Sequence, residues 1–153
     1  MSKPIATNRK AYRDFAFTET WECGIALNGG EVKSIRQGGV NFKDSYARVE
    51  KKEIFLHNLH IDPYAHAGIQ SLDPVRKRKL LLHKREIRKL IELAAQKRLI
   101  LVPTKLYFNK GGFVKLELAA GRGKKLYDKR EDIKRRDIDR SLKRVVKSYR
   151  KKV

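Results

Sequence analysis

The stretch LILVPTKLYFNKGGFVKLELA, residues 99–119, predicts two antiparallel strands joined by a tight turn. The turn is NKGG at 109–112, because Asn and Gly accept the left-handed backbone that short hairpin turns require. After the turn, apolar residues alternate with charged ones along VKLEL, residues 114–118, which gives one apolar face and one wet face. Hairpins of this kind build antiparallel sheets, so the fold is expected to be mainly β.

Further strands are predicted upstream by the same alternation. The chain reads as a strand from Tyr12 to Leu27. The segment SYARVEKKEIFLHNLHI at 45–61 reads as a second pair of strands, hinged at Lys51-Lys52. Its first half alternates polar and apolar residues, so a half-buried hairpin is expected there.

Two helices interrupt the predicted strands. EVKSIRQ at 31–37 has helical spacing, and Gly38-Gly39 ends it after about two turns. A longer helix follows His83, which forms a weak capping pair with Glu86 three residues later. The apolar stripe of that helix consists of Ile87, Leu90, Ile91, Ala94 and Ala95.

The remaining segments complete the expected architecture. Residues 1–10 read as a short flexible arm, residues 62–74 as a loop, and the three leucines at 80–82 either end a strand or begin a helix. About six strands with two to three short helices and a basic C-terminal tail suit a small antiparallel β-barrel of the oligonucleotide-binding type. A mixed open sheet is the alternative. We expect residues 1–120 to form the barrel domain and residues 121–153 to form the tail.

The charge points to the class of partner. The net charge is +21, from 38 Lys and Arg against 17 Asp and Glu. Self-repulsion on this scale opposes compaction, so a nucleic acid is the first expected partner and an anionic membrane the second. Residues 121–153 hold 15 of the basic residues and 5 of the acidic ones, which makes the tail about three times as basic per residue as the body.

The cellular compartment is expected to be the cytoplasm. No apolar run is long enough to span a membrane, and the N-terminal residues lack the apolar core of a signal peptide. The single cysteine, Cys23, fits a reducing compartment because it has no partner for an intrachain disulfide.

Motifs for catalysis or metal binding are missing from the sequence. His57 and His60 are three residues apart, which in one strand places them on opposite faces, so no metal site is expected. GGEVKSIRQGG at 29–39 lacks the spacing of phosphate-binding loops. Cys23 has no base partner and is expected to fill the core. We therefore expect no enzymatic activity, no cofactor and no small-molecule substrate.

Basic residues interleaved with aromatic ones are the positive signal for RNA binding. An aromatic ring can stack a base while the neighbouring cation meets a phosphate. KLYFNK at 105–110 has this pattern, and Tyr12 and Tyr127 either stack in this way or are simply exposed. The strand phenylalanines are expected to lie in the core: Phe15, Phe17, Phe42, Phe55 and Phe113.

The basic tail has a helical pattern of its own. Repulsion among its cations opposes a helix in free solution, and a polyanion would screen that repulsion. We therefore expect the tail to be disordered when free and helical from about Asp132 onward when it is bound to RNA. A helix lying on an anionic membrane is the rival interpretation. The apolar stripe consists of Ile138, Leu142, Val145, Val146, Tyr149 and Val153.

Four segments, taken together and in order, resemble the SmpB family of bacterial SsrA-binding proteins. They are NRKA at 8–11, WECGIALNGGEVKSIRQGGVNFKDSYARV at 21–49, DPVRKRKLLLHKREI at 73–87 and LVPTKLYFNKGGFVKLELAAGRGKKLYDKRED at 101–132. The resemblance covers essentially the whole chain. It departs from the common family pattern at Tyr12 and Arg13, where many members carry Arg and His.

The resemblance implies a role in trans-translation. A barrel of the oligonucleotide-binding type would grip the tRNA-like domain of transfer-messenger RNA (tmRNA) and deliver it to ribosomes stalled on broken messages. The nascent chain is then tagged for degradation and the ribosome is released. Implied partners are tmRNA, the ribosome (chiefly its small-subunit RNA), and the elongation factor that carries aminoacyl-tRNA.

The resemblance also implies two sets of site residues. Asn8, Glu22 and Leu81 match the RNA-facing residues of the family's barrel. The cations expected to bind tmRNA beside them are Arg9, Lys10, Lys33 and Arg36. GKKLYDKR at 123–130 matches the segment that reaches the decoding centre, and the helix beyond it would occupy the empty message channel. The expected ribosome-contacting residues are Gly123, Lys124, Lys125, Tyr127, Asp128, Lys129, Arg130, Lys134 and Arg135.

From the residues alone, two other functions stay open. One is a ribosomal or general RNA-binding protein with a basic extension. The other is an enzyme acting on nucleic acid, which the missing catalytic motifs count against.

Overall fold

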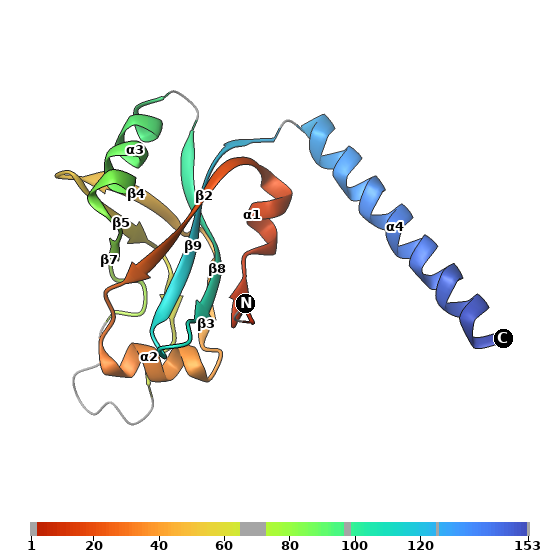
Figure 1. The fold of residues 1–153 in the computed structure, drawn as a ribbon, viewed down its shortest axis with the longest axis horizontal. Helices are drawn as coiled ribbons and strands as arrows, with labels where there is room; N and C mark the ends of the chain where they lie inside the picture. Colours follow the sequence, from red (N-terminus) through yellow and green to blue (C-terminus); the bar gives the residue numbers. More distant parts are fainter. Residues whose placement is uncertain (1–2, 65–72, 97–98, 125, 153) are drawn as a thin grey trace.

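The computed structural model describes residues 3–64, 73–96, 99–124 and 126–152, and for 126–129, 151 and 152 it describes the backbone alone. Within these residues, seven strands form one antiparallel sheet (Figure 1). In sheet order they are β1 (Ala6–Thr7), β8 (Ile100–Phe108), β4 (Tyr46–Glu50), β5 (Glu53–His57), β7 (Arg78–Leu81), β2 (Phe15–Ile25) and β9 (Val114–Gly123). An additional pairing between β8 and β9 closes a ring of six strands, with β1 attached to β8. The expected small antiparallel barrel is thus confirmed, and the open sheet is excluded.

The stretch that predicted the fold forms the hairpin that closes this ring. Strands β8 and β9 pair from Phe108 opposite Val114 to Ile100 opposite Gly121, with a register shift between Pro103 and Lys105. The turn between them ends at Gly112, whose φ of 79° only glycine adopts freely. Sequence and structure therefore agree on the longest hairpin of the molecule.

Two short strands and three helices surround the barrel. Strands β3 (Val40–Asn41) and β6 (His60–Ile61) pair with each other outside the main sheet. Helices α1 (Arg9–Asp14), α2 (Gly29–Arg36) and α3 (Lys84–Ala95) are short, and α4 (Leu126–Lys152) is long.

Local hydrogen bonds set the limits of α2 and α3. The Asn28 side chain accepts from the Glu31 N–H, and the Glu31 carboxylate accepts from the Asn28 N–H, so each helps to cap the start of α2. Gly38, with a φ of 79°, ends it as predicted. The His83 N–H donates to Glu86 Oε2 over 3.2 Å, which confirms the predicted capping pair of α3.

The N-terminal segment differs from the prediction. Ala6 and Thr7 pair with Leu106 and Lys105 of β8, so this part of the chain belongs to the sheet and is no loose arm. The residues after Asn8 then form α1 instead of beginning a strand. The cause is a helix cap, because Asn8 Oδ1 accepts from the Ala11 N–H over 3.1 Å.

The other strands resolve the remaining sequence questions. Lys51 and Lys52 have φ values of 48° and 62°, and they form the turn between β4 and β5 as expected. Of the three leucines at 80–82, the first two end strand β7, and Leu82 follows it. His57 and His60 lie on two different strands, β5 and β6, and not on opposite faces of one strand.

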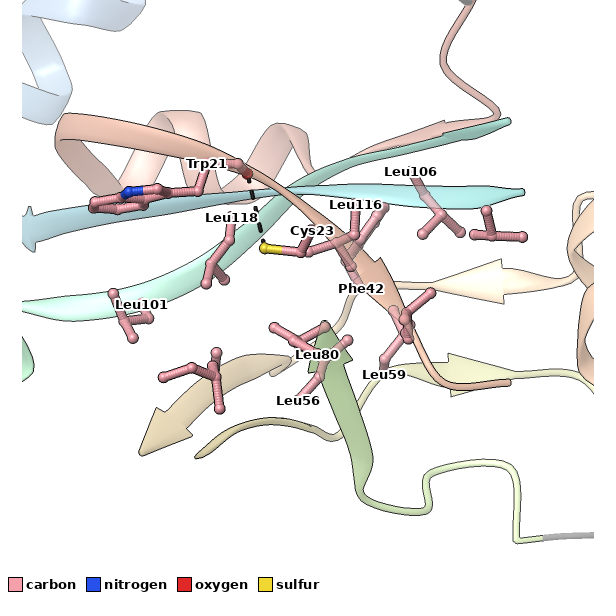
Figure 2. Packing of buried hydrophobic residues seen from close by; sticks show 14 of the residues in the cluster. Trp21, Cys23, Phe42, Leu56, Leu59, Leu80, Leu101, Leu106, Leu116 and Leu118 are labelled. Carbon is pink, nitrogen blue, oxygen red and sulfur yellow. Dashed lines mark hydrogen bonds between the residues drawn. The ribbon is translucent and has the colours of Figure 1, made fainter. Parts of the chain in front are cut away.

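Apolar side chains from most strands of the barrel pack together in its interior (Figure 2). Cys23 is completely buried there, as predicted, and burial raises the pKa of its thiol to about 12. Of the phenylalanines expected in the core, Phe42 is buried, whereas Phe15, Phe17 and Phe55 are half-buried. Phe113 is wrongly predicted, because 70% of it is exposed at the end of the β8–β9 turn.

Helix α4 projects away from the barrel (Figure 1). It begins at Leu126, several residues before the predicted start near Asp132, because the helix continues through part of the GKKLYDKR motif. The described residues of its apolar stripe are exposed, Ile138 by 59% and Leu142 by 58%. Strand β9 runs to Gly123, three residues beyond the expected end of the barrel domain. Among the described helices, none is both long and apolar enough to cross a membrane.

Candidate nucleic-acid interface

Four neighbouring strands, β7, β2, β9 and β8, present one continuous outward surface. Gly24 of β2 lies opposite Leu81 on one side and Lys115 on the other, and Lys115 lies opposite Tyr107. Glu22 lies opposite Glu117 in the next row. The intervening residues, Cys23 and Leu116, point into the core. We call this surface the outer face, and it consists of Glu22, Gly24, Leu81, Lys105, Tyr107, Lys115 and Glu117.

The structure brings two of the predicted RNA-binding residues together on the outer face. Leu81 is 50% exposed, although it belongs to a strand of the barrel. A Cβ atom at Gly24 would lie only 3.1 Å from Leu81 Cβ, so the glycine leaves room for the leucine to lie across β2. Glu22 is two residues from Gly24 on the same face. An apolar surface and a carboxylate therefore stand side by side, as they would to pack against a base and accept a hydrogen bond from it.

Tyr107 holds the Glu22 carboxylate in place. Its hydroxyl donates to Glu22 Oε2, while Oε1 accepts no hydrogen bond from the described residues. Burial, together with this hydrogen bond to Glu22, raises the pKa of Tyr107 well above its usual range. The tyrosine therefore stays protonated at neutral pH and keeps donating, which leaves one carboxylate oxygen pointing to solvent as an acceptor.

Glu117, directly opposite Glu22, is held by hydrogen bonds to other residues. Thr104 Oγ1 donates to Glu117 Oε1 over 2.8 Å, and the Tyr12 hydroxyl donates to the same atom over 3.4 Å. Two carboxylates across a strand pair repel each other, and these donors offset that repulsion. Tyr12 also packs edge-on against Phe17 with a centroid distance of 5.5 Å. The structure thus gives Tyr12 a structural contact with the border of the outer face.

The predicted residues at the start of α1 have divided roles. Asn8 is buried, and its Nδ2 donates to the Pro103 carbonyl over 2.8 Å while Oδ1 caps the helix. Both ends of its amide are therefore engaged by the protein. Arg9 and Lys10 are exposed in the first turn of the helix and line a groove of about 300 Å³ together with Lys43. Asn8 fixes the backbone that presents these cations.

The cations of α2 lie over aromatic rings. Lys33 Nζ is 5.3 Å from the Tyr64 ring centroid, and the Arg36 guanidinium is 5.3 Å from that of Phe108. Such contacts hold a long side chain near the surface while its charge remains available to a phosphate. Arg36 also ties α2 to the end of strand β8.

A buried ion pair, which no local sequence pattern predicts, joins α2 to the barrel. Arg78 is 1% exposed and donates through Nε to Glu31 Oε2 over 2.6 Å, and Arg76 pairs with the other carboxylate oxygen. Burial alone would raise the pKa of Glu31, but the hydrogen bonds from Arg76 and Arg78 outweigh it and hold the pKa below its usual range. These partners are 45 and 47 residues apart in sequence, so no local pattern could reveal them.

The tail residues are divided between the barrel and α4. Gly123 ends β9, and Lys124 joins the two parts, since its Nζ donates to the Tyr12 carbonyl over 3.1 Å and also pairs with Asp132. Arg130, Lys134 and Arg135 are exposed on α4. Lys125 and the side chains of Tyr127, Asp128 and Lys129 lie outside the described residues.

Side chains that could bind a metal occur only in small groups in the described part of the chain. No cluster of three or more His, Cys, Asp or Glu side chains comes together there. His57 instead stacks on Tyr46 and lies 3.0 Å from Glu50 Oε1, while His60 pairs with Asp62. The surface offers cations, aromatic rings and acceptors, which is the chemistry of a binding site.

The fold and this surface define an RNA-binding protein built on an oligonucleotide-binding-type barrel with a cationic helical extension. Comparison with known proteins gives the family. The model of the SmpB protein family matches residues 5–148, and the chain belongs to this family.

Relatives and a solved structure agree with that membership. The chain is 51% identical over 148 residues to the SsrA-binding protein of Thermosipho africanus, covering 97% of this chain and 99% of that protein. It is 57% identical over 145 residues to the SsrA-binding protein of Thermoanaerobacter pseudethanolicus, covering 95% and 92%. It also matches a chain, 51% identical, in a structure described as "tmRNA-SmpB: a journey to the center of the bacterial ribosome". That match has a TM-score of 0.69 over 81% of this chain and 87% of the other.

Proposed function

We propose that this protein binds the tRNA-like domain of tmRNA and delivers it to stalled ribosomes in the cytoplasm, where the nascent chain is tagged and the ribosome released. The observation that carries the proposal is the match to SmpB over nearly the full chain, including a structural relative described with tmRNA and the bacterial ribosome. The protein acts as an adaptor in this process. It supplies binding surfaces and no catalytic step.

The outer face and the cations around it are the proposed tmRNA-binding site. Leu81 packs against an exposed base or sugar, and the free oxygen of Glu22 accepts from an amino group or a ribose hydroxyl. Arg9, Lys10, Lys33 and Arg36 meet phosphates. Asn8 contributes by holding α1 in place.

Helix α4 is the proposed ribosome-binding element. A message channel without message is an RNA-lined tunnel, in which each cation of the helix replaces a counterion. A ribosome that still holds message would exclude the helix sterically, which would confine delivery to stalled ribosomes.

A competition assay tests the proposal. The tRNA-like domain of tmRNA should outcompete elongator tRNA and random RNA at moderate salt. The net charge of +21 by itself favours the second candidate, a general RNA-binding protein with a basic extension, which predicts equal affinities. Equal affinities for the three RNAs would therefore contradict the adaptor proposal. A tagging assay with a non-stop message then tests delivery.

A further inference from the structure

Phe113 is an exposed aromatic residue whose side chain does not pack in the barrel core. It is 70% exposed, whereas Val114, its neighbour in sequence, is only 7% exposed and packs in the core. Phenylalanine gains most from leaving water, so a ring left in solvent at this position contributes little to the stability of the fold. A residue that breaks the inside–outside pattern is a place to look for binding.

The β8–β9 turn holds this residue rigidly. The Phe113 N–H donates to Asn109 Oδ1 over 2.9 Å, and its carbonyl accepts from the Asn109 N–H over 2.9 Å. Gly112 supplies the left-handed backbone between them, with a φ of 79°. A Cβ atom at Gly111 would lie 3.3 Å from Phe113 Cδ2, so one part of the ring rests against the turn. A residue whose backbone is already fixed loses little backbone entropy when a ligand covers it.

Phe113 continues the outer face. Val114 points inward, so strand alternation places Phe113 on the same side as Lys115, two residues further on and about 7 Å away along the strand. Lys115 is the neighbour of Gly24, which carries Leu81 on its other side. The exposed ring therefore extends the surface that holds Glu22 and Leu81.

The surroundings of the ring are cationic. The two segments that meet at this end of the barrel, residues 29–38 and 107–115, contain Lys33, Arg36, Lys110 and Lys115 and a single carboxylate, Glu31. That carboxylate is buried and paired with Arg76 and Arg78. Helix α2 lies beside the turn (Figure 1), and Arg36 contacts Phe108, which is opposite Val114. So much positive charge does not favour contact with an apolar protein surface, whereas it favours contact with the phosphates of RNA.

We propose that Phe113 is a stacking platform for an unpaired base of the RNA on the outer face, with Lys110 and Arg36 available to the flanking phosphates. This inference rests on the proposed function and adds a base contact to it. Base–aromatic stacking tolerates any base, so the platform contributes affinity and position, not sequence selectivity.

Substitution of Phe113 in the full-length protein tests the proposal. Phe113→Leu keeps an apolar side chain and removes the aromatic face, so the affinity for the tRNA-like domain of tmRNA should fall roughly tenfold. The dependence of that affinity on salt should stay unchanged, because no phosphate contact is lost. Phe113→Trp should bind at least as tightly as the wild type, and the indole emission it adds should be quenched by the RNA. Trp21 is buried and contributes a constant background.

Val75→Ala is the matched control, since Val75 is an apolar residue, 43% exposed, outside the outer face. It should bind RNA as the wild type does. All three variants should have the melting temperature of the wild type, because these side chains are exposed. Wild-type affinity for Phe113→Leu, or unquenched emission from Phe113→Trp, would overturn the inference.

Three further outcomes separate this inference from the proposed function. If the wild type prefers tmRNA while Phe113→Leu binds equally well, the inference alone is wrong and the adaptor function stands. If Phe113→Leu keeps its RNA affinity but loses association with the elongation factor, Phe113 is a protein contact and the stacking platform is again overturned. If the wild type shows no preference for tmRNA, the adaptor function fails first.

Discussion

Glu31 compensates the buried positive charge of Arg78. The Arg78 guanidinium is almost completely buried and also donates to the carbonyls of Leu59 and Pro74, over 2.6 and 3.0 Å. Glu31 is the carboxylate that neutralises it. Removing one partner of a buried pair leaves an uncompensated charge, which is far more costly than losing an exposed pair.

The first prediction concerns this pair. Glu31→Gln should lower the free energy of unfolding by about 3 kcal/mol, measured by chemical denaturation. Glu53→Gln is the matched control, because its pair with Lys79 is nearly half exposed, and it should change that free energy by less than about 1 kcal/mol. Equal effects of the two substitutions would contradict the importance given to the buried pair.

The pKa of Glu31 gives this prediction a pH dependence. The pKa is lower in the folded protein than in the unfolded chain, so the contribution of the pair is complete above the unfolded value, about 4.3, and is lost as the pH falls through the folded value. The wild type should therefore lose stability steeply below that pH. Glu31→Gln should show a shallower acid loss in the same denaturation series.

Tyr107 supports the second prediction. Tyr107→Phe removes the hydroxyl that orients Glu22, so binding of the tRNA-like domain should weaken by about 1 kcal/mol. In Glu22→Gln the same tyrosine substitution should have a much smaller effect, because the two side chains act as a unit. Tyr46→Phe, on strand β4, is the control and should bind normally. Additive effects at Tyr107 and Glu22 would refute the coupling.

At the scale of secondary structure, the sequence predicts elements whose apolar pattern matches their packing. The β8–β9 hairpin, the β4–β5 hairpin and helices α2 and α3 follow from alternation, helical spacing and turn residues. Helix α1 does not, because its six residues are too few to show a helical period. Its position is set by Asn8, which accepts a hydrogen bond from the Ala11 N–H and donates one to the Pro103 carbonyl. Likewise, the sequence suggested Glu22 and Leu81 only through family resemblance, since their proximity depends on strand register.

The third prediction concerns helix α4. The helix projects from the barrel, is linked to it near its start through Lys124, and is coated with cations. Its amides should therefore exchange hydrogen far faster than those of β8 and β9 in the free full-length protein. Binding to small-subunit ribosomal RNA should slow the exchange of α4, because the polyanion screens its repulsion. Protection equal to that of the sheet before RNA is added would show that the helix is stable by itself.

The whole molecule places its proposed RNA-binding surfaces far apart. The outer face lies on the barrel, whereas α4 extends away from it (Figure 1). Both carry cations, and residues 121–153 account for 15 of the 38 Lys and Arg. Two separate surfaces suit a protein that addresses two RNA molecules at once.

The fourth prediction follows from this separation. Removal of the residues after Lys124 should weaken binding of the tRNA-like domain only modestly and should abolish tagging on stalled ribosomes. Lys124 is the appropriate end point, because its N–H donates to the Asp14 carbonyl over 2.8 Å and β9 is complete before it. Substituting Lys134 and Arg135 by alanine gives a full-length comparison, in which tmRNA binding should be unchanged. Normal tagging by the truncated protein would refute the division of labour.

The contacts of Lys124 make the length of α4 a determinant of how far the molecule reaches from the barrel. This side chain contacts both the Tyr12 carbonyl of α1 and Asp132, so it links the first turns of the long helix to the barrel. Its 27 residues span about 40 Å. Deleting one residue from the helix would shorten that reach by about 1.5 Å and rotate everything beyond it by about 100°. The length of the helix and the rotation of its far end are therefore coupled. Only changes in length by whole turns would preserve which side of the helix faces a given surrounding surface.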